Sequence, residues 1–267
     1  LFANVKLNYE LSKFVKGKIF VCPPMSDEGN ALGSAILLNN QKFGVPISSQ
    51  KKINNIYWGN KIVIKKNQFE KHNVKIRKIK TSLSAFIAKA LSEKKIFGIV
   101  NGRMEFGPRA LGNRSIICEC KNKNINNTLN NKLNRSEFMP FAPIMRIENA
   151  EKYFHIKDIS KFEHTSKFMT ICLKARDSLI KKCPAIVHVD NTARPQFISK
   201  KCNPLIYEVL LKYEKLSSAP ALINTSFNVH EEPIVNDFSS SLFSAFYSNL
   251  DYLIINNKLV DINQNKV

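Results

Sequence analysis

Arginine is concentrated in one short segment of this chain. Residues 102–115 read GRMEFGPRALGNRS and contain Arg103, Arg109 and Arg114, three of only eight arginines in a chain whose positive charge is mostly lysine. A guanidinium offers paired donors that match the oxygens of a carboxylate or phosphate, which an ammonium group cannot copy. The three glycines and the proline of this segment favour a loop whose backbone approaches a ligand closely. The segment therefore predicts an anion-binding loop.

Three further polar segments occur at the ends of predicted strands. They are residues 134–143 (NRSEFMPFAP), 188–196 (HVDNTARPQ) and 224–228 (NTSFN). Each alone has a structural explanation, because Asn, Asp, Ser and Thr satisfy backbone groups in turns. Together they add Arg135 and Arg194, so five of the eight arginines lie in strand-end loops. We expect these loops to share one anion site.

The elements that position these loops follow from hydrophobic spacing. We expect strands at 19–22, 96–100, 115–120, 168–173, 185–189 and 221–223. Helices are expected at 30–38, 83–91 with Thr81 as cap, 125–133, 204–216, and 238–249 with Asp237 as cap. Residues 252–262 read as a closing hairpin. The arginine segment directly follows a strand, where α/β sheets commonly present ligand loops.

Composition bounds the class of protein. The 267 residues suffice for one large domain or two smaller ones, and residues 44–73, which show no clear period, are the expected boundary. No apolar run reaches the roughly 18 residues of a membrane-spanning helix. Six scattered cysteines without a C-x-x-C pair predict a reduced, cytoplasmic protein. The first residue is leucine, so we expect the sequence to be a fragment.

The net charge of +20 has two interpretations. A dense basic surface is typical of nucleic-acid binding. Here, however, the lysines are spread along the whole chain among many asparagines and isoleucines, which indicates a general compositional bias. We favour the bias and keep nucleic-acid binding as the alternative.

The motifs resemble a known family. The strings GRMEFGPRALGNRS, NRSEFMPFAP, HVDNTARPQ and NTSFNVHEEPIV are similar, in order and spacing, to the carboxy-terminal domain of the carbamoyltransferases that modify nodulation factors, tobramycin and cephamycins. The upstream strings LFANVKLN and FVCPPMSDEGNALGSA resemble the end of the preceding domain. The resemblance implies an α/β (α+β) architecture. Residues 1–70 would be the remnant of an actin-like (sugar kinase and Hsp70-like) ATPase domain, and 78–262 a YrdC-like, threonylcarbamoyl-adenylate-synthase-like domain with a twisted sheet and a basic cavity.

The resemblance also implies an activity, that of an ATP-dependent O-carbamoyltransferase. The second domain would make carbamoyl adenylate from carbamoyl phosphate and ATP with Mg²⁺, and the first would transfer the carbamoyl group to a hydroxyl of a sugar-containing acceptor. Preset guanidinium groups would stabilise the negative charge that gathers at the α-phosphate. The residues assigned to catalysis are Arg103, Arg109, Arg114 and Arg194, and those assigned to substrate or ATP binding are Arg135, Asn224, Ser226, Asn228 and Asn4.

A metal site is implied only in part. The family's matching aspartate for Asp27 binds an iron-type divalent metal together with two histidines on an earlier helix. The five histidines of this chain include no pair at i, i+4 spacing, so the histidine ligands are expected to lie outside this sequence. Met139 stands where many relatives have arginine, which leaves one phosphate contact absent or supplied by Arg135.

Two other functions stay open from the sequence. One is a tRNA-linked enzyme of the threonylcarbamoyl type, and the other is a non-catalytic nucleotide-binding fragment. The acceptor, whether a lipo-oligosaccharide sugar, an antibiotic or a surface glycan, is not determined by these residues. A homodimer is kept as a candidate assembly.

Overall fold

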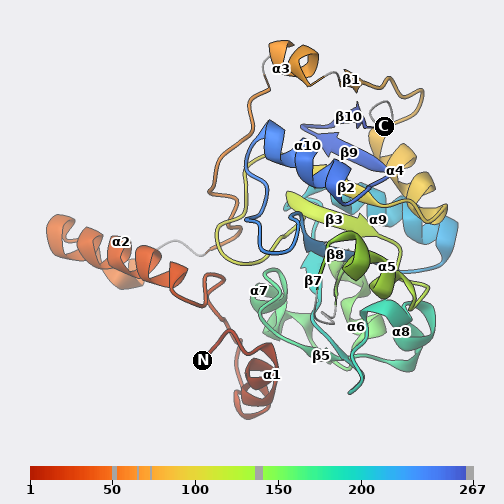
Figure 1. Ribbon diagram of the computed structural model, residues 1–267. Helices are drawn as coiled ribbons and strands as arrows, with labels where there is room; N and C mark the ends of the chain where they lie inside the picture. The colour runs from red at the N-terminus through yellow and green to blue at the C-terminus, as the bar shows by residue number, and fades with distance from the viewer. Residues whose placement is uncertain (50–52, 65, 73, 136–140, 263–267) are drawn as a thin grey trace.

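An eight-stranded mixed sheet is the frame of the molecule (Figure 1). The computed structural model describes residues 1–49, 53–64, 66–72, 74–135 and 141–262. The strands lie in the order β1-β10-β9-β2-β3-β8-β4-β7. Their bounds are β1 Lys75–Ile76, β2 Phe97–Val100, β3 Arg114–Cys118, β4 Ala142–Arg146, β7 Gln196–Ile198, β8 Ala221–Ser226, β9 Tyr252–Ile255 and β10 Lys258–Asp261. A separate pair joins β5 Leu173–Lys174 to β6 Thr192–Ala193.

The centre of the sheet brings the arginine segment beside the end of β8. Every residue of β2 and β3 is buried, as expected for short strands covered on both faces. Strand β3 runs antiparallel to β8, with Ser115 opposite Ser226 and Ile117 opposite Asn224. Because the two strands are antiparallel, the start of β3 and the end of β8 lie at the same edge of the sheet. The described parts of the polar loops predicted to share a site meet at this edge; residues 136–140, which include Met139, lie outside the described residues.

The main helices begin at side-chain caps. Helices α4 Leu83–Ser92 and α9 Pro204–Ser217 pack against each other, and α10 Phe238–Tyr247 lies against β9. The cap of α4 is Ser82, whose hydroxyl accepts from the Ala85 amide (3.3 Å), so the prediction of Thr81 is wrong by one residue. The cap of α10 is Asp237, as predicted. The remaining helical segments are α3 Lys66–Lys71, α5 Ile125–Lys132, α6 Ala150–Tyr153, α7 Glu163–Ser166, α8 Asp177–Lys182 and the 3₁₀ turns Ile47–Ser49, Ile147–Asn149, Ile159–Lys161 and Pro184–Ile186.

Three predicted strands are wrong. Residues 19–22 form no strand, although the Ile19 amide donates to the Lys161 carbonyl (3.1 Å). Of residues 168–173 only Leu173 enters a strand, and 185–189 begins with a 3₁₀ turn that starts at Pro184. These segments contain buried apolar residues, and a short apolar run does not by itself separate a strand from a buried loop. Strands β4 and β7 were missed. The predicted helices at 83–91, 125–133, 204–216 and 238–249 and the closing hairpin are confirmed to within a few residues.

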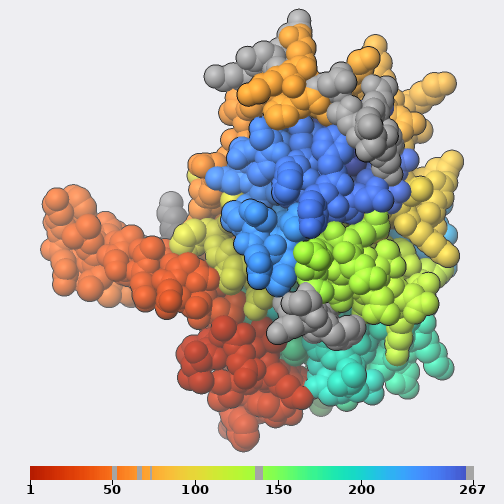
Figure 2. Space-filling model, viewed as in Figure 1, coloured from red at the N-terminus to blue at the C-terminus, as the bar shows by residue number. Residues whose placement is uncertain are grey.

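The amino-terminal segment consists of two helices with different surroundings. Helix α1 (Val5–Phe14) packs on the larger body, where the Asn8 side chain donates to the Thr170 carbonyl (2.7 Å) and the Lys6 ammonium pairs with Asp190 (2.6 Å). Helix α2 (Glu28–Phe43), which contains the predicted helix 30–38, projects away from the body (Figures 1 and 2), and none of its residues is buried. It ends at Gly44, whose positive φ of 65° suits glycine. No helix in the described ranges has both the length and the apolar character needed to span a membrane.

The Lys6–Asp190 pair predicts a pH-dependent attachment of α1. Hydrogen bonds from Lys6 and Thr192 hold the pKa of Asp190 well below its ordinary value. A carboxyl whose pKa is depressed on folding stabilises the fold above its unfolded pKa of about 4, and this contribution is lost as the pH falls toward the lower folded value. We expect Asp190→Asn to unfold at lower urea concentration than wild type at pH 7, with a difference that shrinks below about pH 4 and in high salt. A difference independent of pH would contradict this account.

Candidate functional site

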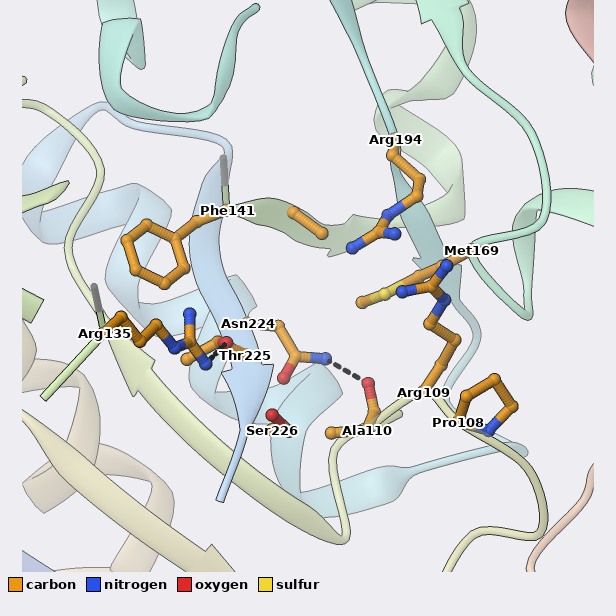
Figure 3. Close-up of a pocket in the computed structure, with 11 residues that line it drawn as sticks. Pro108, Arg109, Ala110, Arg135, Phe141, Met169, Arg194, Asn224, Thr225 and Ser226 are labelled. Atoms are coloured by element: carbon orange, nitrogen blue, oxygen red, sulfur yellow. Dashed lines mark hydrogen bonds between the residues drawn. The ribbon is translucent and has the colours of Figure 1, made fainter. Parts of the chain in front are cut away.

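A small polar cavity lies at the sheet edge where β3 begins and β8 ends (Figure 3). Its volume is about 90 Å³, which suits a small anion. Its walls come from the arginine segment, the start of β4, the end of β8 and two loops. The lining residues are Pro108, Arg109, Ala110, Arg135, Phe141, Ala142, Met169, Arg194, Asn224, Thr225 and Ser226.

Two guanidinium groups point toward each other in this cavity, those of Arg109 and Arg194 (Figure 3). Neither has a hydrogen bond or ion pair within the part of the chain that the structure describes, and Nε of Arg109 is buried without a partner. Burial, reinforced by the charge of Arg109, lowers the pKa of Arg194 to about 10. Burial also lowers the pKa of Arg109, which the carboxylate of Glu28 partly offsets. Two like charges held together and partly shielded from water favour a bound anion, because an anion would satisfy both.

A third arginine, Arg135, faces the cavity from the opposite side (Figure 3). Its Nη2 donates to the Thr225 hydroxyl (3.0 Å), and its guanidinium carbon lies 5.3 Å from the centre of the Phe141 ring. These contacts hold the group in one orientation. Burial lowers its pKa, so this cation too is partly desolvated.

Asn224 and Ser226 line the same cavity from β8. The Asn224 amide nitrogen donates to the Ala110 carbonyl (3.1 Å) and to Gln196 Oε1 (2.8 Å). Its Oδ1 is buried and has no partner among the described residues. A buried acceptor left unpaired is costly, so a ligand that donates a hydrogen bond here would remove that cost.

Two of the predicted catalytic arginines lie elsewhere. Arg114 is fully buried at the start of β3, and its guanidinium donates to the backbone carbonyls of Asn101 (3.4 Å), Asn113 (2.8 Å), Asn60 (3.0 Å) and Gly102 (3.2 Å). Arg103 is exposed and donates to the carbonyls of Gly59 (3.0 Å) and Trp58. Neither lines the cavity. Both act as braces between residues 58–60 and the arginine segment.

The carboxylate that shapes the arginine loop, Glu105, was missed by sequence reasoning. Its Oε1 accepts from the amides of Leu111 (2.6 Å), Asn113 (2.8 Å) and Arg114 (3.2 Å). Burial raises the pKa of Glu105, and these hydrogen bonds oppose that shift. Its position inside an otherwise basic segment was the available signal. Glu105 therefore folds residues 105–114 into the loop that presents Arg109.

Replacing Glu105 tests this role. Glu105→Ala leaves three amides without their acceptor, so we expect it to lower the free energy of unfolding by about 2–3 kcal/mol. Glu105→Gln keeps an acceptor oxygen and should lose clearly less. Urea unfolding measures both, with Glu10→Ala, an exposed residue paired with Lys13, as the control. Equal losses of unfolding free energy in the two Glu105 variants would show that the hydrogen bonds from the loop amides do not account for the contribution of Glu105 to stability.

Two further predicted binding residues have other partners. The Asn228 side chain donates to the carbonyls of Val229 (2.9 Å) and Glu232 (2.9 Å), which closes the turn after β8, and it does not line the cavity. Asn4 is the cap of α1, where its Oδ1 accepts from the amides of Lys6 (3.1 Å) and Leu7 (3.0 Å). The structure brings neither residue to Arg109 and Arg194.

The described residues do not fit a metal ion at Asp27. This carboxylate is exposed and precedes α2. Within the described ranges no group of three His, Cys, Asp or Glu side chains is close enough to hold a metal. The six cysteines are all free thiols. Among the described residues Asp27 therefore offers a single ligand, and no chemical step is assigned to a metal there.

Comparisons with known proteins agree with the motifs. A family model described as the carbamoyltransferase C-terminus matches residues 88–261. An uncharacterized protein of Methanocaldococcus jannaschii, MJ1051, is 33% identical over 266 residues, which are 96% of this chain and 48% of that protein. Nodulation protein NolO of Bradyrhizobium diazoefficiens is 34% identical over 91% of this chain and 44% of its own length.

A third relative carries an enzymatic name. The 3'-hydroxymethylcephem-O-carbamoyltransferase of Streptomyces clavuligerus is 30% identical over 83% of this chain and 39% of its own length. The chain thus spans less than half the length of each of these three relatives. Among solved structures, full-length HypF in its phosphate- and nucleotide-bound form superposes with a TM-score of 0.48 at 23% identity, covering 67% of this chain and 26% of that one.

Proposed function

Because the chain belongs to the carbamoyltransferase family, whose C-terminal domain it carries, we propose that it forms carbamoyl adenylate within an ATP-dependent O-carbamoyltransferase. The observation that carries this proposal is the cavity in which Arg109 and Arg194 face each other beside the Asn224 acceptor, all three without a partner among the described residues. Carbamoyl phosphate has both features that these groups require, a phosphate for the guanidinium groups and an amide N–H for the acceptor.

The cavity volume supports carbamoyl phosphate as the substrate that binds inside it. About 90 Å³ accommodates carbamoyl phosphate or one phosphate group of ATP, whereas the base and ribose of ATP require space outside it. We assign carbamoyl phosphate to Arg109, Arg194 and Asn224, with Arg135 and Ser226 on the side of the cavity that ATP would approach. ATP binds with Mg²⁺, which neutralises part of its charge.

The reaction balances in two steps. Water cleaves the bond between the phosphorus and the bridging oxygen of carbamoyl phosphate, which releases phosphate and leaves carbamate. A carbamate oxygen then attacks the α-phosphorus of ATP, and pyrophosphate leaves with the electron pair of the broken P–O bond. Charge develops on phosphoryl oxygens in both steps, so guanidinium groups already in place stabilise it without reorganising.

The acceptor and the final transfer lie outside the described cavity. One relative is named as a carbamoyltransferase of a hydroxymethyl compound, an alcohol, and on that basis we propose a hydroxyl acceptor, here on a sugar-containing molecule. The acceptor oxygen would attack the carbamoyl carbon, lose its proton and release AMP. We propose that residues 78–262 form the YrdC-like adenylate-forming domain and residues 1–70 the end of an actin-like transfer domain. We propose the cytoplasm as the compartment, since all six cysteines are free, and a homodimer as the assembly.

Pyrophosphate release is the direct test. The chain should release pyrophosphate when ATP, Mg²⁺ and carbamoyl phosphate are all present, and should stop when any one is omitted. Release that does not depend on carbamoyl phosphate would indicate a plain ATPase. Binding of ATP with no release under any condition would favour a non-catalytic nucleotide-binding fragment instead.

A specific observation favours the second candidate, a tRNA-linked enzyme of the threonylcarbamoyl type. The charged residues that line a groove of about 450 Å³ are Lys16, Lys18, Lys157 and Lys161, beside His155 and one carboxylate, Asp158. A cluster of this kind attracts a phosphate backbone. Binding of tRNA that weakens steeply with salt and is lost in Lys18→Glu and Lys157→Glu, with Arg194 intact, would support this candidate over a sugar acceptor.

A further inference from the structure

We infer that Gln196 makes the cavity selective for a donor that carries an N–H group, because it fixes which end of the Asn224 amide faces the ligand. The inference rests on the proposed function and goes further in naming what discriminates between acyl phosphates of equal size. Gln196 is the first residue of β7, and Asn224 lies in β8. Their side chains are 1% and 2% exposed, so water does not compete with the hydrogen bonds between them.

The direction of each hydrogen bond is set by backbone carbonyls. The Leu111 carbonyl can only accept, so the group of Gln196 that lies 2.8 Å from it must be the NH₂. Gln196 Oε1 is then the atom that meets Asn224 at 2.8 Å, and it too can only accept. Asn224 must therefore present its NH₂ there, as it also does to the Ala110 carbonyl at 3.1 Å. The side chains cannot be turned around without placing two acceptors in contact.

The Oδ1 atom of Asn224 determines which group of a ligand can bind beside it. With its NH₂ held by two partners, Asn224 has only Oδ1 left to offer, and this atom is buried with no partner in the part of the chain that the structure describes. It accepts a hydrogen bond from a carbamoyl NH₂ and leaves an acetyl methyl unmatched. With a methyl group in this place the buried acceptor stays without a hydrogen bond, so the cost of leaving it unpaired is not removed.

The hydrogen-bonded pair Gln196 and Asn224, with the carbonyls of Leu111 and Ala110 at its two ends, forms a relay that connects this selectivity to the arginine loop. Its two terminal carbonyls belong to Ala110 and Leu111, which directly follow Arg109 in the chain. The same loop thus supplies a phosphate-binding guanidinium and orients the acceptor for the amide. We expect phosphate affinity and amide selectivity to be separable, because the relay contains no charged group.

Two stable phosphonates of matched shape test the inference. Phosphonoacetamide carries the NH₂, 2-oxopropylphosphonate has a methyl in its place, and inorganic phosphate probes the guanidinium pair alone. By calorimetry we expect wild type to bind the amide about 30-fold more tightly than the ketone. In Gln196→Met the Ala110 carbonyl is the remaining partner of the Asn224 NH₂, so we expect that ratio to fall in part, to about tenfold or less, with phosphate affinity within about twofold of wild type, since the lost contact is neutral.

A rescue and a matched control complete the design. Gln196→Glu in its protonated form keeps an oxygen that accepts from Asn224 and a donor for the Leu111 carbonyl, so below the pKa of that carboxyl its ratio should stay close to that of wild type even if both affinities fall. Asn228→Leu removes another side chain with a buried unpaired Oδ1, one that does not line the cavity, and should leave the ratio unchanged.

The outcomes separate the inference from the proposed function. Equal binding of the two phosphonates by wild type, or an unchanged ratio in folded Gln196→Met, would overturn the inference while the proposed function stands. If Gln196→Met does not fold, Asn224→Leu, which removes the acceptor itself, takes its place. A lower ratio of amide to ketone affinity than in wild type would support the inference, and an unchanged ratio would overturn it. Failure of wild type to bind phosphate or to release pyrophosphate would instead remove the proposed function.

Discussion

Replacing Arg194 by alanine is expected to reduce pyrophosphate release by at least about a hundredfold, the effect of removing one preset charge-stabilising group from an active site. Arg194 faces Arg109 across the cavity and has no partner within the described structure, so its donors are available to the phosphate of the substrate. Arg194→Lys should recover only part of the loss, because an ammonium group does not provide two parallel donors. Steady-state pyrophosphate release measures both variants.

The same substitution should not weaken the fold. Burial and the neighbouring Arg109 both disfavour the charged form of Arg194, which is why its pKa is lowered to about 10. Removing a desolvated cation that lacks a partner relieves repulsion, so we expect an unchanged or higher midpoint of thermal unfolding. A loss of activity together with a higher midpoint is the signature of a residue kept for ligand binding.

Arg103→Ala is the matched control for Arg194→Ala. Arg103 belongs to the same motif, but its guanidinium donates to the carbonyls of Gly59 and Trp58 on the exposed side of the loop. We expect pyrophosphate release to stay within about threefold of wild type, since exposed hydrogen bonds contribute little. If Arg103→Ala were as inactive as Arg194→Ala, the assignment of the anion site to this cavity would be wrong.

Replacing Arg114 by methionine is expected to have the opposite profile, a large loss of stability. The side chain is fully buried, and its guanidinium donates to four backbone carbonyls, those of Asn101, Asn113, Asn60 and Gly102. Methionine fills much of the space and leaves these acceptors without their donor. We expect the free energy of unfolding to fall by about 4–5 kcal/mol, as when one side of a buried charged network is removed.

Thermal unfolding checks this expectation. A loss of that size lowers the midpoint by about 10 °C or more in a chain of this length. Phosphate binding measured well below the midpoint should survive in Arg114→Met, because Arg114 does not line the cavity. If Arg114→Met had a normal midpoint of thermal unfolding but no longer bound phosphate, Arg114 would be a ligand-binding residue after all.

Hydrophobic spacing predicted much of the fold. The elements that it did not predict each have a physical reason. The helices over Leu83–Ser92, Pro204–Ser217 and Phe238–Tyr247 were predicted because each repeats an apolar face over several turns. Strand β7 was missed because three residues are too few to show a period, and β4 because its second residue is Pro143. Residues 168–173 and 185–189 were assigned as strands because burial in a loop selects the same apolar residues as burial in a sheet.

The sequence by itself determined the family and the supply of arginines. Four motifs in fixed order were sufficient to identify the family. The contrast between scarce arginine and abundant lysine was sufficient to mark the arginines as candidate site residues. It also placed Arg109, Arg194 and Asn224 on one list of site residues, and the structure brings them to one cavity.

Only the tertiary structure decided which arginines remain free to bind a ligand. A guanidinium donates equally well to a phosphate and to a peptide carbonyl, so residue type cannot separate Arg109 from Arg114 five positions later. Residues 58–60, far away in sequence, supply carbonyls that accept from Arg103 and Arg114, whereas Arg109 and Arg194 have no such partner in the described ranges. The roles of Glu105 and Gln196 are hidden for the same reason, since each is defined by backbone groups that only the folded chain brings within hydrogen-bonding distance.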